Sequence, residues 1–251
     1  MIRYSKKSVA IAGLGLLLAA AVVIAVGASY GTIAMTAIFQ TSWRDTVGQI
    51  RAELSRGNDD EALRLIQPLL AANQKREEIA EVCMELGKGL ADEGKRDAAE
   101  PLLRKTLEIR EALHGAENLQ VVEASFLLAQ LYLSKASVLQ IAAANREASE
   151  YLDQAERLLD TALQTRERLS GPKSVGVSDV LQQLTVLCLQ RHGFAETACP
   201  ENFERRKRIA EILTGNLPPT HPDWAKALYS LADSQEARVR SINRWFSDRP
   251  F

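Results

Sequence analysis

Self-similarity along the chain is the feature that most constrains its fold. Four segments superimpose without gaps, each ending in Leu followed by a small residue or Thr: residues 76–87, 118–129, 174–185 and 221–232. Self-similarity at a period of about 20–50 residues is typical of repeat proteins, in which one unit cannot bury its apolar face alone and stacks on its neighbours. No strand-like alternation accompanies it, so a helical stack is predicted.

Two of these units continue the match into a second segment. The matched residues are Ala99, Leu102, Leu103, Leu107, Arg110, Glu111, Leu113 and Gly115 in one, and Ala155, Leu158, Leu159, Leu163, Arg166, Glu167, Leu169 and Gly171 in the other. The apolar ones recur every three or four residues, which is one face of a helix. Gly94 supplies a turn before this helix, and Asp97 with Glu100 is interpreted as a capping box at its start. Each unit is therefore predicted to be a helix-turn-helix.

These units resemble the tetratricopeptide repeat (TPR) family, in the 42-residue variety of kinesin light chains. The resemblance is carried by Thr220-His221-Pro222-Asp223, by Leu128-Ala129-Gln130-Leu131-Tyr132, and by Leu107 to Glu111 followed by Gly115. It covers roughly residues 44–235. The resemblance implies an all-α fold, a TPR-like α-solenoid of helix-turn-helix repeats, and a protein-binding role.

The spacing between the Leu anchors of the four segments is not constant. Successive anchors lie 42, 56 and 47 residues apart. The excess of about 14 residues in the second interval falls near residues 134–150, whose Ala-rich sequence favours helix over a surface loop. Shared between two antiparallel helices, these residues predict a hairpin that projects from the solenoid.

The chain is divided accordingly. Residues 43–75 are a degenerate first repeat, with Gly57 and Ala62 in the places of Gly94 and Ala99. Residues 76–235 hold the TPR-like repeats, and residues 236–251 form a basic amphipathic tail. About four helix pairs and a last helix result, enough for a stable solenoid because at least three stacked repeats bury a continuous core.

An uncharged segment precedes the repeats. Residues 8–42 contain no charged residue, and Val9 to Val26 is almost entirely Ala, Val, Ile, Leu and Gly. About 20 such residues cross a bilayer as a helix, so a transmembrane helix followed by a juxtamembrane segment is predicted. The alternative is a signal peptide cleaved near Val26-Gly27-Ala28, although the apolar run exceeds the roughly 7–15 residues of a signal core.

Orientation follows from the flanking charges. The basic residues of the flank at residues 1–7 are Arg3, Lys6 and Lys7, whereas Arg44 and Asp45 cancel at the other end. The positive-inside rule then keeps the N-terminus cytoplasmic and places the repeat domain of this single-pass protein on the extracytoplasmic side.

The charge of the chain and its sequence motifs limit the functions that we expect. Without the three basic residues of the N-terminal flank, the chain carries 28 basic and 32 acidic residues, which argues against nucleic acid as a partner. There is no HExxH, Walker loop or nucleophile elbow. We therefore expect no catalytic residue, cofactor, metal or small-molecule substrate. An enzyme of unrecognised type is the alternative class.

Cysteine usage leaves one question open. Cys188, His192 and Cys199 are the only cluster of metal-type ligands, at a spacing that no common zinc site has. Cys188 stands in the repeat position of Tyr132, which predicts a thiol packed between helices. A disulfide between Cys188 and Cys199 is the alternative if the domain is extracytoplasmic. Cys83 is expected to pack inside its helix.

The resemblance also implies where a partner binds. Repeat solenoids bind on a concave surface lined by the first helix of each pair. In kinesin-light-chain-like repeats, Asn residues just before the Leu-Ala pair hold the bound peptide. The corresponding residues chosen as the protein-binding groove are Phe126, Leu127, Gln182, Gln183 and Tyr229. Their apolar character suits a helix or a folded surface, but Phe126 and Leu127 could instead pack against the long hairpin.

The tail offers a second contact. Arg240 and Arg244 lie on one side of a helix, and Ile242, Trp245 and Phe246 cluster elsewhere. This helix either caps the last repeat or contacts a partner or membrane through Trp245, Phe246, Arg240 and Arg244. The function predicted from the sequence is a membrane-tethered scaffold or adaptor for protein partners. A secreted repeat protein is the alternative.

Overall fold

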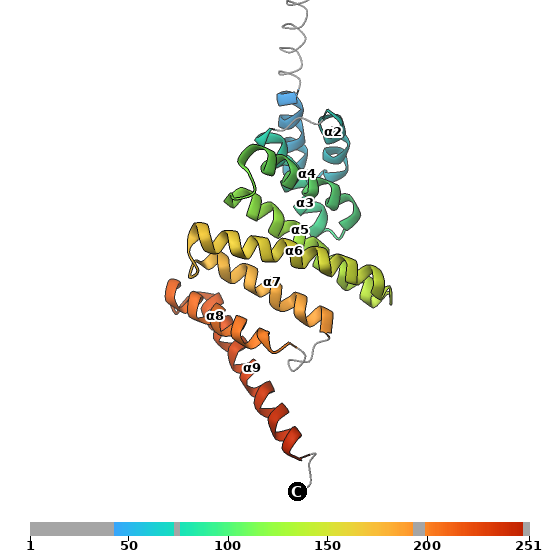
Figure 1. The fold of residues 1–251 in the computed structure, drawn as a ribbon. Coiled ribbons are helices and arrows are strands. Elements are labelled where there is room, and N and C mark those ends of the chain that lie inside the picture. Colours follow the sequence, from blue (N-terminus) through green and yellow to red (C-terminus); the bar gives the residue numbers. More distant parts are fainter. Residues whose placement is uncertain (1–42, 73–75, 193–198, 248–251) are drawn as a thin grey trace, which may run out of the picture. The chain divides into compact units, whose positions relative to one another are not determined.

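Helices and turns make up the described part of the chain, which is residues 43–72, 76–192 and 199–247 of a computed structural model (Figure 1). Residues 43–55 are helical. The helices that follow are α2 (Asp59–Ala71), α3 (Glu77–Asp92), α4 (Arg96–His114), α5 (Leu119–Ile141), α6 (Asn145–Ser170), α7 (Val175–His192), α8 (Glu201–Asn216) and α9 (Pro222–Ser247). The predicted all-α class is confirmed for these residues.

The chain divides into two compact units, Met1–Leu69 and Leu70–Phe251. In the first unit, the described helices are residues 43–55 and α2, and Gly57 between them has a positive φ of 74°. Their buried residues recur every three or four positions, as on one face of a helix: Trp43, Val47 and Ile50, then Ala62, Ile66 and Leu69.

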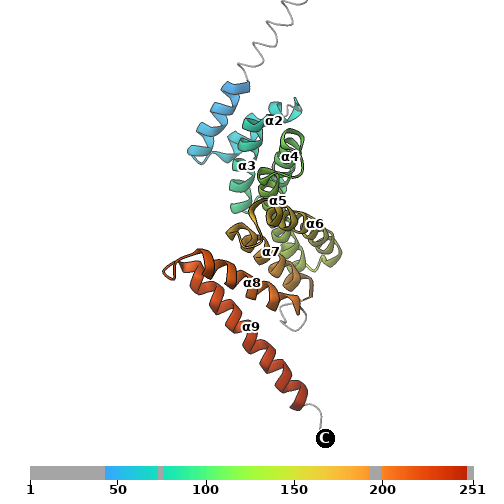
Figure 2. The same ribbon diagram turned by 60° about the vertical axis from the view of Figure 1, so that its left-hand side comes forward.

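In the second unit, each helix from α3 to α9 packs against the next one along the chain (Figure 1, Figure 2). Three pairs result, α3 with α4, α5 with α6 and α7 with α8, and α9 follows them. First helices also touch across pairs, α3 with α5 and α5 with α7. The second unit is thus a stack of antiparallel hairpins, with its core between successive helices.

Two of the hairpin turns share one hydrogen-bond pattern. Between α3 and α4, Gly94 has φ 82° and the Lys95 N–H donates to the Leu90 carbonyl over 2.8 Å. Between α5 and α6, the Ala144 N–H donates to the Leu139 carbonyl over the same distance, but Ala143 takes the left-handed conformation with φ 61°. This conformation suits glycine and crowds the Cβ atom of alanine.

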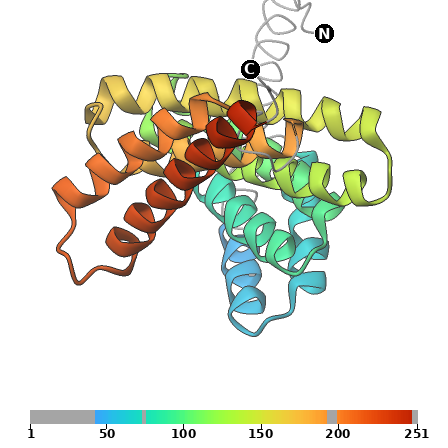
Figure 3. The same ribbon diagram turned by 90° about the horizontal axis from the view of Figure 1, so that it is seen from below.

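The α5–α6 hairpin is longer than its neighbour. α5 and α6 have 23 and 26 residues, whereas α7 and α8 have 18 and 16. The residues in excess of the 42-residue spacing lie in α5 and α6, and the tip of the hairpin projects past the end of α7 (Figure 3). Ile141 at this tip is 86% exposed.

The interpretation of Asp97 and Glu100 as a capping box is wrong. α4 begins after Lys95 without a side-chain cap. Both carboxylates instead accept from the ammonium of Lys135 on α5, each over 2.6 Å. This ammonium also lies 4.8 Å from the ring centroid of Tyr151 on α6. A charged hydrogen bond is stronger than a neutral one, so the two acids join α4 to α5 instead of capping their own helix.

Arginines on the second helices join successive pairs. Arg110 on α4 donates to the Gln120 carbonyl over 3.0 Å and lies 3.1 Å from Glu123, both on α5. Arg166, its equivalent on α6, donates over 2.7 Å to the carbonyl of Gly176 on α7. It also lies 3.7 Å from Asp179, which occupies the repeat position of Glu123.

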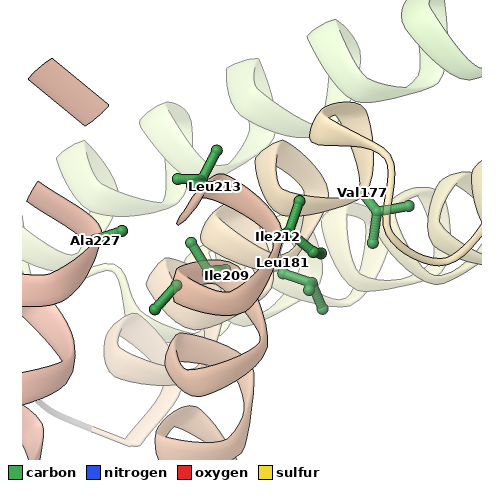
Figure 4. Close-up of a cluster of buried hydrophobic side chains, with 7 residues drawn as sticks. Val177, Leu181, Ile209, Ile212, Leu213 and Ala227 are labelled. Atoms are coloured by element: carbon green, nitrogen blue, oxygen red, sulfur yellow. The ribbon is translucent and has the colours of Figure 1, made fainter. Parts of the chain in front are cut away.

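The joint between α8 and α9 lacks this arginine. The corresponding stretch of α8 carries Ile212 and Leu213, which are buried in a cluster with residues of α7 and α9 (Figure 4). The other buried members of the cluster are Val177, Leu181, Ile209, Ala210 and Ala227. The last joint is therefore held by apolar burial, and it borders the site described next.

Candidate functional site

A cavity of about 400 Å³ opens between α7 and α9, with α8 behind it. We call it the α7–α9 pocket. Its lining residues are Gln182, Thr185, Val186 and Leu189 of α7, Arg206 and Ile209 of α8, and Asp223, Lys226, Ala227 and Ser230 of α9. All belong to the second unit of the chain. The pocket thus lies between α7, the first helix of the last pair, and α9, which follows that pair, on the side of the stack where solenoids bind their partners.

The floor of the pocket is apolar. Ile209 and Ala227 are almost fully buried members of the cluster in Figure 4. Val186 is 40% exposed, so part of its side chain faces solvent at the wall of the pocket. Apolar surface that is rigidly backed and reachable from solvent favours the binding of an apolar group.

The rim of the pocket is polar and charged. The ammonium of Lys226 lies 3.2 Å from the Asp223 carboxylate; the Lys226 side chain is largely exposed, and that of Asp223 is about half exposed. Burial raises the pKa of the nearby Asp179 carboxyl; Arg166 opposes this rise, and the charge of Asp223 adds to it. Gln182 and Ser230 add an amide and a hydroxyl, so the rim can hydrogen-bond a partner and orient it.

Comparison of the repeats shows a difference at the wall of this pocket. Phe126 on α5 occupies the repeat position of Gln182 on α7. The half-buried ring of Phe126 lies in the preceding joint, and the guanidinium carbon of Arg166 lies 5.9 Å from its centroid. Gln182 is exposed, provides no ring at this position, and lines the α7–α9 pocket. The pocket therefore offers room for an apolar side chain that the chain does not supply.

A second hollow, of about 420 Å³, lies among the first turns of α5 and α7 and the end of α6. Its lining residues are Leu119, Gln120, Glu123, Arg166, Ser170, Ser174, Gly176 and Asp179. Arg166 and Asp179 already take part in the contacts that join α6 to α7. We take the α7–α9 pocket as the stronger candidate because its floor is apolar.

The groove residues chosen from the sequence fall in different places. Gln182 lines the α7–α9 pocket. Phe126 and Leu127 are half-buried, and the guanidinium carbon of Arg166 lies 5.9 Å from the centroid of the Phe126 ring. Gln183 is half-buried and Tyr229 is 77% exposed, and neither lines the pocket.

Sequence reasoning missed Val186 and Lys226. They lie one helical turn from Gln182 and Ser230 respectively, on the faces of α7 and α9 that line the pocket. Extending the chosen positions Gln182 and Tyr229 by three or four residues along their helices would have found them, because residues at these spacings lie on the same side of a helix.

The C-terminal contact is described only in part. α9 runs through residue 236 to Ser247, so the tail continues the last helix. Arg240 is exposed and lies 3.5 Å from Glu236. The side chains of Arg244, Trp245 and Phe246 lie outside the described part of the structure, and their role stays a prediction.

The structure pairs Cys188 with Cys199. Their sulfur atoms form a disulfide with a Cα–Cα distance of 6.1 Å, and both residues are buried. Cys188 is thus not the packed free thiol that the repeat position predicts. Cys83 is free, and burial raises the pKa of its thiol to about 12, so this thiol is unreactive at neutral pH. Within the described residues, no group of three or more metal ligands occurs.

No described helix is long and apolar enough to cross a membrane. The predicted transmembrane segment, residues 8–42, lies outside the described residues, so the structure leaves this prediction untested.

Residues 79–119 match the family described as tetratricopeptide repeat. This match spans α3 and α4 and ends at the first residue of α5. A helix pair with these boundaries is the unit predicted from the self-similarity of the chain. This segment of the chain is therefore similar to a tetratricopeptide repeat.

Solved structures share the fold of the stack. One is a kinesin light chain of Podosopora anserina with nearly identical TPR-like repeats, at a TM-score of 0.55 and 16% identity over 80% of this chain and 88% of that one. Another is BtubC (BKLC) of P. vanneervenii, at a TM-score of 0.56 and 16% identity over 80% of each chain. At this identity the likeness shows the fold alone. The search of curated proteins found no significant match.

Proposed function

We propose that this chain, a TPR-like solenoid behind an uncharged N-terminal segment, is a membrane-tethered scaffold that holds a protein partner in the α7–α9 pocket. One observation carries the proposal: the joint between α7 and α9 has an open pocket with an apolar floor, lined by the exposed Gln182 at the repeat position where α5 carries Phe126. TPR-like repeats generally bind proteins, and the non-catalytic role of a scaffold agrees with that.

The pocket indicates how the partner is held. An apolar side chain of the partner enters beside Val186 and Ile209 and removes their exposed surface from water. The rim groups Gln182, Lys226 and Ser230 then hydrogen-bond polar groups next to that side chain. A helix or a folded surface meets both needs, since it presents an apolar anchor within a polar surround.

The membrane tether and the orientation rest on the sequence and are supported by the cysteines. Residues 8–42 are long and uncharged enough to span a bilayer, and the basic residues precede them. An extracytoplasmic repeat domain lies in an oxidising compartment, and disulfides such as Cys188–Cys199 form and persist in such compartments. Sequencing the mature N-terminus separates an anchored chain that begins at Met1 from a secreted one that begins near Ser29.

The binding site is tested by affinity purification of the full chain from detergent-solubilised membranes, with mass spectrometry of bound proteins. Val186→Glu puts a charge on the wall of the pocket and is expected to weaken partner capture by at least about thirtyfold, the effect of losing a packed anchor. Val138→Glu is the matched control, because Val138 is similarly exposed at 45% but lies near the hairpin tip. It should leave capture unchanged. Capture that survives Val186→Glu, or that Val138→Glu abolishes, contradicts the proposal.

A further inference from the structure

The Cys188–Cys199 disulfide lies beside the α7–α9 pocket. Cys188 directly precedes Leu189, which lines the pocket, and Cys199 lies two residues before the first residue of α8. The bond therefore ties the end of α7 to the beginning of α8, the helix that supplies Arg206 and Ile209 to the pocket.

Hydrogen bonds reinforce the same joint. The fully buried Asn202 donates from Nδ2 to the carbonyl of Thr185, a lining residue, over 3.2 Å. Arg205 donates to the Leu184 carbonyl over 3.4 Å and to Asn202 Oδ1 over 2.9 Å. The first turn of α8 is thus held on α7 by one covalent bond and a short polar network, and this turn leads directly into the pocket wall.

In the preceding hairpin, α5 and α6 are joined at the equivalent position without a disulfide. Tyr132 occupies the repeat position of Cys188, and its ring centroid lies 5.5 Å from that of Tyr151 on α6. The hydroxyl of Tyr132 also accepts from Arg104 over 2.8 Å. α7 and α8 are shorter than α5 and α6, so their interface is smaller. The disulfide replaces aromatic packing where little helix is available for packing.

We propose that the Cys188–Cys199 disulfide is a redox device that makes the α7–α9 pocket competent to bind, an inference that rests on the function proposed above. When the bond is formed, the first turn of α8 stays on α7 and the pocket keeps its wall. When the bond is reduced, this turn separates from α7 more often and the pocket loses its shape. The scaffold then binds its partner more tightly in an oxidising compartment.

The chemistry is thiol–disulfide exchange. The thiolate of one cysteine attacks a donor disulfide, such as that of glutathione or of a thiol oxidoreductase, and one donor thiol leaves. The second cysteine then attacks this mixed disulfide and expels the other donor thiol. Two thiols of the chain lose two electrons and two protons in total, and the donor disulfide gains them.

The bond itself is tested on the full chain purified in detergent without reductant. Alkylation after denaturation should count one thiol, that of Cys83, and three thiols after reduction. A count of three thiols before reduction would show that the disulfide is absent and would overturn the inference.

The device is tested by hydrogen–deuterium exchange, which needs no partner. Exchange in residues 182–190 and 201–210 should become about tenfold faster on reduction with a dithiol and in the Cys188→Ser/Cys199→Ser double variant, because local opening becomes easier. Exchange in α3 and α4 should stay unchanged, which shows that the rest of the stack is folded. Equal exchange in the oxidised and reduced wild-type protein overturns the inference.

The two proposals fail separately. If Val186→Glu abolishes partner capture but reduction leaves the rate of hydrogen–deuterium exchange unchanged, only the redox inference is overturned. If exchange responds to reduction but Val186→Glu leaves capture intact, the pocket is not the binding site, and the inference falls with the proposed function. The inference is supported when exchange responds and reduction of the wild-type protein also lowers capture to the level of Val186→Glu.

Discussion

Single residues determine which repeat positions are buried in the core and which line the α7–α9 pocket. Three of the four Leu anchors behave alike: Leu86, Leu128 and Leu184 are all at most 4% exposed, whereas Leu231 is half-buried. The position two residues before Leu128 and Leu184 does not, because Phe126 is half-buried beside Arg166 whereas Gln182 is exposed and lines the pocket. One difference within the repeat pattern thus changes whether this position is half-buried or exposed.

Ala143 has a backbone conformation that is unfavourable for alanine. Its left-handed φ of 61° in the α5–α6 turn matches that of Gly94 in the preceding turn, where the residue is glycine. Ala143→Gly should therefore raise the free energy of unfolding by about 0.5–1 kcal/mol and the Tm by about 2–3 °C. Thermal melts of the full chain in detergent, followed by circular dichroism, measure this.

The neighbouring residue provides the control for this substitution. Ala142 has φ −79° and gains nothing from glycine. Ala142→Gly should leave the Tm unchanged or lower it. An equal rise of the Tm for both variants would show that the turn is not strained at Ala143.

At the scale of helices, successive hairpins are joined in two ways. Arg110 and Arg166 hold the first two joints of the stack through carbonyls and carboxylates of the next helix. The last joint is held by the apolar cluster around Leu213. The change from polar to apolar joint coincides with the α7–α9 pocket, so the end of the stack is where apolar surface becomes reachable.

Removing the arginine of the first joint should destabilise the stack. The side chain of Arg110 is only 4% exposed and is bonded to the Gln120 carbonyl, Glu123 and Glu77. Arg110→Ala leaves these groups without their charged donor, which costs about 2–3 kcal/mol and lowers the Tm by about 4–12 °C.

Arg168→Ala is the matched comparison in the same melts. Arg168 pairs with Glu117 over 2.9 Å, but both side chains are more than half exposed. Its replacement should change stability by less than about 0.5 kcal/mol. Similar losses for the two arginines would contradict the role given to the buried one.

At the scale of the whole molecule, the fold could be predicted from the sequence and the pocket could not. The Leu anchors and the glycine turns repeat because every hairpin needs the same packing, so the spacing predicted the helix pairs. Whether Phe126 or Gln182 faces filled or open space depends on the side chains of the helices packed around it. The same holds for Asp97 and Glu100, whose partner Lys135 is distant in sequence.

Membrane topology is a prediction at this scale. The basic flank before residues 8–42 predicts a cytoplasmic N-terminus and an extracytoplasmic repeat domain. In sealed membranes, protease added on the extracytoplasmic side should therefore digest residues 43–251, whereas protease on the cytoplasmic side should leave them intact. Digestion from the cytoplasmic side would show the opposite orientation. The repeat domain would then lie outside the oxidising compartment that the disulfide requires.

Site-specific photo-crosslinking in intact membranes tests the central claim most directly. A photoreactive benzoylphenylalanine replaces Val186 in the α7–α9 pocket in one variant of the full chain, and Val138 near the hairpin tip in the other. The account predicts that illumination links a protein partner to position 186 and not to position 138. Adducts at position 138, with none at position 186, would show that the partner binds the projecting hairpin and that the pocket is not the binding site.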